Sequence, residues 1–267
     1  MKQASVSEQV VIDTARELGR ALGASKAFRE YERALEHYQM DPSAADLLEQ
    51  ARRLEQEGSM QEMLWGNSGG DWAEKLASLR QQVRTHPAIR DLQQAETGLR
   101  ALLFGTVLRL GDLTGIDYAE ACTGRGRSGC GPARPAEEFA AALRDSPDIA
   151  AAVEMLARSI QETEAFQRFE VTRSAFQNDP DVVRVREQVR SAVSAYVEAE
   201  KNGSVTLDVI QNVRSVQNRL REHLLVHEFS NKRQEVHSAF QAVNQAVGEA
   251  LGIDIAQVVA PASGCCG

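Results

Sequence analysis

The four cysteines of the chain are gathered in two short segments, and thiolates are good ligands for metal ions. Cys122 and Cys130 lie near the middle of the chain, and Cys265 and Cys266 are adjacent at its end. Glycines accompany both pairs and allow a backbone to wrap closely around a ligand. Four thiolates are the usual complement of a tetrahedral zinc ion or a cubane iron–sulfur cluster. The sequence therefore predicts a metal site formed by these four residues.

The spacing of the cysteines leaves other interpretations open. Neither pair has the Cys-x-x-Cys spacing of a zinc knuckle, so a disordered, reduced tail or a reversible disulfide would also account for them. None of the four lies in a segment that we expect to be helical. If metal binds, we expect one site shared by both pairs within the chain. The alternative is that each pair contributes to a site shared with another chain.

No other set of residues resembles an active site. No serine lies in a nucleophile elbow, and no glycine-rich phosphate loop follows a strand. The histidines share no position between the two halves of the chain, and we interpret His223 and His227, four residues apart, as surface residues. We therefore expect no catalytic residues and a protein that is not an enzyme.

The elements that position the cysteines come from an internal repeat. Residues 27–32 return as residues 165–170 at an offset of 138, and Asp41-Pro42 returns as Asp179-Pro180. Residues 115–119 match residues 252–256 at an offset of 137, and a glycine- and cysteine-containing tail follows each of these segments. Such a match in one register indicates duplication. We expect a first domain over residues 1–131, a linker and lead-in helix over 132–147, and a second domain over 148–267.

Hydrophobic spacing predicts helices throughout. Val11, Ala15, Leu18 and Leu22 are three or four residues apart and form one face of a helix. Aspartate caps a helix and proline fits its first position, so each Asp-Pro pair marks a helix start. The fold class is therefore all-α, with two tandem copies of a small helical bundle. We expect a core that includes the following residues: Phe28, Tyr31, Leu47, Phe166, Phe169 and Val185.

Glu32 and Glu170 recur beside these aromatic residues. A recurring carboxylate could bind metal or serve as an acid or base. Because no Glu-x-x-His motif accompanies it, we interpret both as helix-surface residues next to a core aromatic pair.

Composition limits the functions that the chain can have. Hydrophobic residues make up 43% and aromatic residues 5%, which indicates an aliphatic core. The formal net charge of −8 argues against direct binding to nucleic acid. No stretch approaches the roughly 18 apolar residues of a membrane helix, and no signal peptide is visible. We expect a cytoplasmic protein with reduced cysteines.

The order of these motifs resembles the YlbF/YmcA family of small helical regulators. The resemblance rests on Ala27, Phe28, Tyr31, Glu32 and Asp41-Pro42, together with their partners 138 residues later. Many members carry a glycine–cysteine tail such as residues 264–267. The tandem arrangement is a departure, since the best-known members have one domain. The second copy also lacks the proline break of His86-Pro87.

The resemblance implies a regulatory or adaptor protein. It implies similarity to subunits of a bacterial complex that influences competence, biofilm formation and sporulation, associates with RNase Y in mRNA processing, and carries iron–sulfur clusters. The expected cofactor is a 4Fe-4S cluster, with zinc as the alternative. The expected partners are related helical regulators and the RNase Y complex, with the two copies packed as a pseudo-dimer or the chain forming a homo-oligomer. An iron–sulfur electron-transfer module and a metal-free helical interaction protein are the competing hypotheses.

Overall fold

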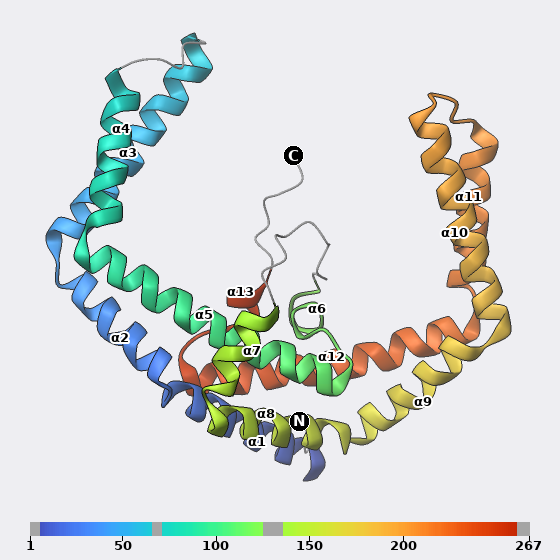
Figure 1. Cartoon of the computed structure of the whole chain (residues 1–267). Coiled ribbons are helices and arrows are strands. Elements are labelled where there is room, and N and C mark those ends of the chain that lie inside the picture. Colours follow the sequence, from blue (N-terminus) through green and yellow to red (C-terminus); the bar gives the residue numbers. More distant parts are fainter. Residues whose placement is uncertain (1–5, 66–70, 125–135, 261–267) are drawn as a thin grey trace, which may run out of the picture.

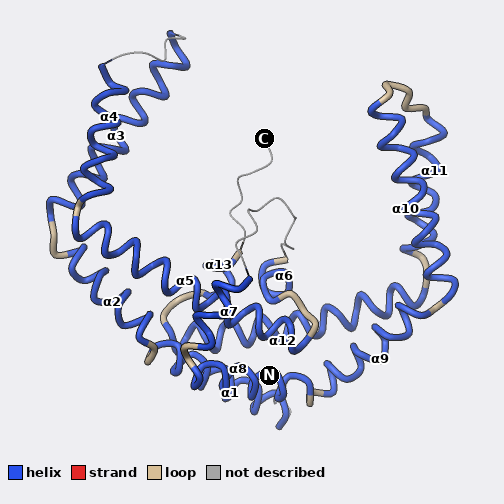
Figure 2. The backbone as a smooth tube through the Cα atoms, in the orientation of Figure 1, coloured by secondary structure: helices blue, strands red, loops and turns tan. Residues whose placement is uncertain are grey.

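The computed structural model describes residues 6–65, 71–124 and 136–260, and every regular element within them is an α-helix (Figure 2). This confirms the all-α prediction. The first copy contains α1 (Val6–Gly23), α2 (Lys26–Gln39), α3 (Pro42–Trp65), α4 (Asp71–Thr85), α5 (Pro87–Thr114) and α6 (Tyr118–Thr123). The second copy follows α7 (Ala136–Arg144) and contains α8 (Pro147–Gln161), α9 (Glu164–Asn178), α10 (Pro180–Lys201), α11 (Leu207–Arg221), α12 (Leu224–Leu251) and α13 (Ile255–Val259).

The helices form an open U with a thick base and two thin arms (Figure 1). Helices α1, α8 and the inner parts of α5 and α12 make the base. Helices α2 and α5 lead into the first arm, which ends in the α3–α4 hairpin, and α9 and α12 lead into the second, which ends in the α10–α11 hairpin. None of the described helices combines the length and apolar composition that crossing a membrane requires.

The two copies begin their helices with the same local devices. The Ser25 hydroxyl accepts a hydrogen bond from the Phe28 amide at 3.1 Å, and the Thr163 hydroxyl accepts one from the Phe166 amide at 3.2 Å. Such side-chain caps satisfy amide groups that have no partner within the helix. Helix α10 starts at Pro180, and Asp179 caps it by accepting from the Val182 amide at 2.8 Å. Both Asp-Pro pairs therefore mark helix starts, as predicted.

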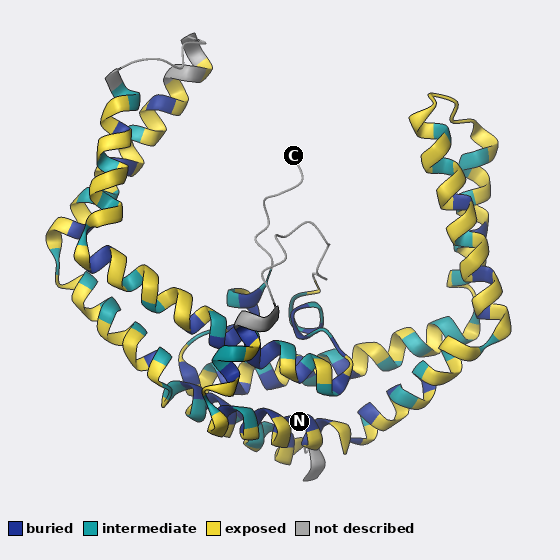
Figure 3. Cartoon of the chain, in the orientation of Figure 1, coloured by how far each residue is buried: buried dark blue, intermediate teal, exposed yellow. Residues whose placement is uncertain are grey.

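The two copies share one hydrophobic core because they exchange their first helices. Helix α1 of the first copy packs against α12 and α8 of the second, and α8 packs against α5 of the first. Figure 3 shows the buried residues concentrated in this base. Its fully buried side chains come from both copies and include Leu22, Leu103, Leu156 and Phe240. The copies therefore form an intramolecular pseudo-dimer with one main core between them.

One contact in the base depends on glycine. A Cβ atom on Gly19 of α1 would lie 2.7 Å from the Ala250 Cβ and 2.9 Å from the Val247 carbonyl oxygen, both on α12. These distances are shorter than van der Waals contact allows, so only glycine permits α1 and α12 to approach this closely.

The arms bury much less than the base. A small separate cluster of Ala44, Ala88 and Ile89 lies where the first arm bends. Phe28, Phe166, Phe169 and Val185 are buried as expected, but Tyr31 and Leu47 are only half-buried. The prediction was wrong for these two: Tyr31 packs at the edge of the shared core, and Leu47 lies on a two-helix arm that no further layer covers. Four of the six expected core residues are therefore buried, Val185 of the second arm among them, and the other two are half-buried.

Candidate functional site

The segments that carry the two cysteine tails start next to each other. Helix α6 is the last element of the first copy and α13 is the last element of the second, and the two helices contact each other on the inner side of the U (Figure 1). Each begins with a capping aspartate: the Glu120 amide donates to Asp117 at 3.0 Å, and the Gln257 amide donates to Asp254 at 3.3 Å. Both copies thus direct the chain to one place at the centre of the molecule.

Cys122 is the one expected metal ligand that lies among the described residues. It lies in α6, which corrects the prediction that no cysteine is helical; the turn of helix is too short to show a periodic pattern. Its Sγ donates to the Phe240 carbonyl oxygen of α12 at 3.5 Å, and the side chain packs against the shared core. Burial is the main cause that raises the pKa of the Cys122 thiol to about 12, and the carboxylates of Asp117 and Asp254 add to it.

The corresponding position of the second copy explains why Cys122 is half-buried against the core. Gly115 and Gly252 end α5 and α12 with positive φ values of 67° and 77°. At that offset of 137 residues, Cys122 corresponds to Val259, which is 2% exposed. A cysteine thiol is close to a small apolar side chain in its packing. As placed, Cys122 therefore fits the role of a core residue better than that of a metal ligand.

The other three expected ligands, Cys130, Cys265 and Cys266, lie outside the described residues. Within the described ranges, no group of three or more His, Cys, Asp or Glu side chains could hold a metal ion.

A polar network anchored on Asn244 of α12 fastens the two short helices. The Asn244 Oδ1 accepts from the Tyr118 hydroxyl of α6 at 3.0 Å and from the Ala256 amide of α13 at 3.1 Å. Its Nδ2 donates to Asp254 at 3.0 Å. Burial raises the pKa of Tyr118 well above its ordinary value, so the hydroxyl stays a donor. The Asn244 side chain therefore fixes the positions of α6 and α13, the helices from which the two tails start, relative to each other.

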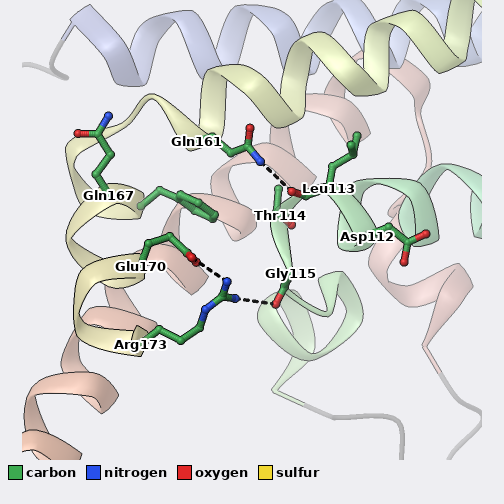
Figure 4. Close-up of a pocket in the computed structure, with 9 residues that line it drawn as sticks. Asp112, Leu113, Thr114, Gly115, Gln161, Gln167, Glu170 and Arg173 are labelled. Carbon is green, nitrogen blue, oxygen red and sulfur yellow. Dashed lines mark hydrogen bonds and ion pairs between the residues drawn. The ribbon is translucent and has the colours of Figure 1, made fainter. Parts of the chain in front are cut away.

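An open pocket of about 590 Å³ lies between the end of α5 and the start of α9 (Figure 4). Arg173 of α9 donates to Glu170 at 2.7 Å and to the Gly115 carbonyl oxygen at 3.3 Å, and Gln161 donates to the Leu113 carbonyl oxygen at 2.7 Å. These contacts satisfy carbonyl groups at the C-terminal end of α5. The second Glu170 oxygen is buried without a hydrogen-bond partner.

The recurring glutamates do not form a matched chemical site. Glu32, the partner of Glu170, is exposed, and the position of Arg173 holds Leu35 in the first copy. Glu170 pairs with an arginine that caps a helix from the other copy, as a structural ion pair does. Glu32 therefore fits the interpretation as a surface residue, whereas Glu170 is half-buried with one buried carboxylate oxygen.

A shared pair of histidines was missed from the sequence. His86 and His223 occupy the N-cap positions of α5 and α12, and both have a buried Nδ1 atom without a hydrogen-bond partner. The prediction that no histidine position is shared is therefore wrong. The change of offset from 138 to 137 hides the match, and Leu224 replaces the proline that follows His86. The His86 Nε2 atom also lies 3.0 Å from the Ser43 hydroxyl oxygen. This contact links the start of α5 to the start of α3 at the bend of the first arm.

Comparison with known protein families identifies the family to which the chain belongs. Searches of curated proteins and of solved structures found no significant match. A family model described as control of competence regulator ComK, YlbF/YmcA, matches residues 11–105 and 149–252. The two matched segments run from α1 into α5 and from α8 to the C-cap of α12, so each covers one copy of the repeat. The chain therefore belongs to the YlbF/YmcA family, as a tandem duplication of its helical unit.

Proposed function

We propose that this protein is a non-enzymatic regulatory adaptor that holds an iron–sulfur cluster through its tail cysteines and acts through protein partners. The family description supports the regulatory role. The observation that carries the cluster is the contact between α6 and α13, since it brings the origins of both cysteine-containing tails together.

The argument for a bound group comes from the chemistry of the thiolates. Because α6 and α13 are in contact, the two tails start side by side, and we infer that Cys130, Cys265 and Cys266 serve one common site. Thiolates close together repel each other unless a cation neutralises them. An iron–sulfur cluster or a zinc ion meets that requirement, and cysteine thiolates are the ligands that both prefer. When bound, the cluster would supply a redox- and oxygen-sensitive group.

Cys122 is a weaker member of this set than the sequence alone indicates. Its thiol donates to the Phe240 carbonyl oxygen and fills the place that Val259 fills in the second copy. To bind metal, the thiol would have to leave that contact. We therefore assign ligation to Cys130, Cys265 and Cys266, and leave the fourth ligand position to Cys122, a non-cysteine ligand or another chain.

Anaerobic purification with an absorbance spectrum and iron and sulfide counts per chain tests the cluster. We expect a broad brown absorbance in the wild type and its loss when Cys130, Cys265 or Cys266 is replaced by serine. Cys122→Val is the matched control, because valine occupies the equivalent position of the second copy. Loss of iron in Cys122→Val would make Cys122 the fourth ligand. Zinc alone, or full iron retention in all three serine variants, would contradict the proposal.

The resemblance to YlbF/YmcA proteins supports a proposal about partners. We propose related helical regulators as direct partners and RNase Y-linked mRNA processing in the cytoplasm as the pathway, with effects on competence, biofilm formation and sporulation. Co-purification of the tagged chain, with RNase Y as the probed partner, tests this part. Association that disappears in the Cys265→Ser variant would connect the partner to the tails. Absence of RNase Y from every such complex would refute the pathway and leave the cluster untouched.

A further inference from the structure

The outer hairpins of the two arms carry opposite net charge. Residues 42–85 contain seven acidic and five basic residues, whereas residues 180–221 contain five acidic and seven basic residues. The whole chain has a net charge of −8, so the second hairpin is a basic region on an acidic protein. A local charge of this kind attracts and orients a partner of opposite sign.

The difference comes equally from two fewer acidic and two more basic residues in the second hairpin, whose arginines also occupy new positions. Helices α3 and α10 align at an offset of 138 because both begin at proline, and α4 and α11 align at 137 because each ends shortly before the N-cap histidine. Four arginines of the second hairpin then replace non-basic residues of the first, at the aligned pairs Asp46/Arg184, Leu48/Arg186, Ala77/Arg214 and Gln82/Arg219. Two more arginines, Arg190 and Arg221, correspond to Arg52 and Arg84 of the first hairpin.

Most of these arginines have no intramolecular acidic partner. All six are exposed. Arg184 pairs with Asp181 at 2.7 Å, and the Arg186 guanidinium lies 5.4 Å from the centre of the Phe176 ring. In the part of the chain that the structure describes, the other four form no ion pair within 4.0 Å: Arg190, Arg214, Arg219 and Arg221. Their charges are therefore available to a partner.

The hairpin groups these side chains along its length. Helices α10 and α11 pack antiparallel, so the first half of α10 lies beside the last half of α11 (Figure 1). Arg186 and Arg190 are four residues apart and share one face of α10. Arg214 and Arg221 are seven residues apart and share one face of α11. The unpaired guanidinium groups thus lie toward the base of the second arm.

We propose that the base of the second arm is a docking surface for an acidic polypeptide segment of a protein partner. The arginine fork binds carboxylates through two parallel hydrogen bonds, which gives orientation as well as attraction. The residues outside 180–221 carry a net charge of −10, from −8 minus +2, and repel a long polyanion such as a nucleic acid. A short acidic segment avoids most of that repulsion. The inference deepens the protein-partner part of the proposed function and is independent of the cluster.

Binding of a fluorescein-labelled poly-glutamate peptide to the full chain, followed by fluorescence anisotropy, tests this surface. We expect binding that weakens as salt rises toward about 0.3 M, where the Debye length becomes short. The double variant Arg214→Ala/Arg219→Gln installs the residues of the first hairpin and is expected to weaken binding about fivefold or more. Arg84→Gln, in the first hairpin, is the matched control and is expected to change it little.

A second variant and a second probe make the outcome decisive. Arg190→Gln/Arg221→Gln is expected to weaken binding as well, and helical circular dichroism checks that each variant is folded. Peptide affinity that is absent, or equal in wild type and both double variants, overturns the proposal. A single-stranded oligonucleotide of matched charge that binds more tightly than the peptide overturns it in favour of nucleic acid. Iron content of the same preparations is expected to stay constant, which separates this result from failure of the cluster.

Discussion

Cys122 and Val259 occupy the same place in the two copies but differ in chemistry. Both lie on the short helix that follows the long one, and both side chains pack against the shared core. The glycines and the second cysteine that follow Cys122 suggest a ligand when only the sequence is read. In the folded chain the thiol contacts the Phe240 carbonyl oxygen and packs against the core, in the place that valine takes in the second copy. Only comparison with the folded second copy reveals this, since the aligned residue is a valine.

The Cys122→Val variant is expected to keep nearly all the stability of the protein. The two side chains are similar in volume, and volume-conserving core changes cost less than about 1.5 kcal/mol. Thermal unfolding followed by circular dichroism measures the effect. Cys122→Asp, which places a charge in the same partly buried position, is the comparison and is expected to lower the midpoint much further. A large loss in the valine variant would contradict a packing role.

The Arg173→Leu variant, which installs the residue of the first copy, is expected to destabilise the protein by about 1 kcal/mol. It removes the hydrogen bonds to Glu170 and to the Gly115 carbonyl oxygen. The pair is about a third exposed, so solvent screening keeps the loss small. In a double-mutant cycle with Glu170→Gln, denaturant unfolding is expected to show that the two changes are less than additive. Additive losses would show that the pair is not coupled.

Among the elements, helix starts were predictable and helix partners were not. Asp-Pro pairs and apolar spacing act within a few residues, so the sequence alone places α3 and α10 correctly. The partner of α1 depends on how the turn after Gly23 directs the chain, and no local pattern shows that α1 packs on α12 of the other copy. The one-residue difference between the hairpins also hid the equivalence of His86 and His223. The tail cysteines were proposed as metal ligands from their residue types alone. Cys130, Cys265 and Cys266 lie outside the described residues, so that part of the prediction stays a prediction.

Substitution of Gly19 by alanine is expected to destabilise the base by about 1–3 kcal/mol. The added methyl group would overlap Ala250 and the backbone of α12, and overpacking has costs of this size. Gly98→Ala on α5 is the matched control, because nothing lies within 4 Å of its Cβ position. There the better helix propensity of alanine is expected to stabilise by about 0.5–1 kcal/mol. Chemical denaturation measures the change in the free energy of unfolding for both variants. A change of the same sign in Gly19→Ala and Gly98→Ala would contradict the close contact of α1 with α12.

The whole molecule is one folding unit made from two copies. Exchange of α1 and α8 gives each copy an apolar helix face that only the other copy covers, so neither half has a complete core. The thin arms then project from a single shared base, and their different charges give the molecule two unlike ends. A tandem chain can evolve such a difference, whereas two identical subunits would carry the same surface on both arms.

A protease site placed within residues 125–135 tests this unity. After cleavage, the two halves are expected to remain one particle, because Val11, Ala15, Leu18 and Leu22 of the first half stay buried against the second. Burial of each larger side chain is worth about 1.5–3 kcal/mol, and the sum over the shared base exceeds what the lost covalent link contributes. Size-exclusion chromatography with light scattering measures the mass of the cut protein, and unfolding in denaturant followed by refolding is the control for reversible association. Cut halves that elute separately under native conditions, each still helical, would show that the copies have independent cores and that the exchange of α1 is not what holds the base together.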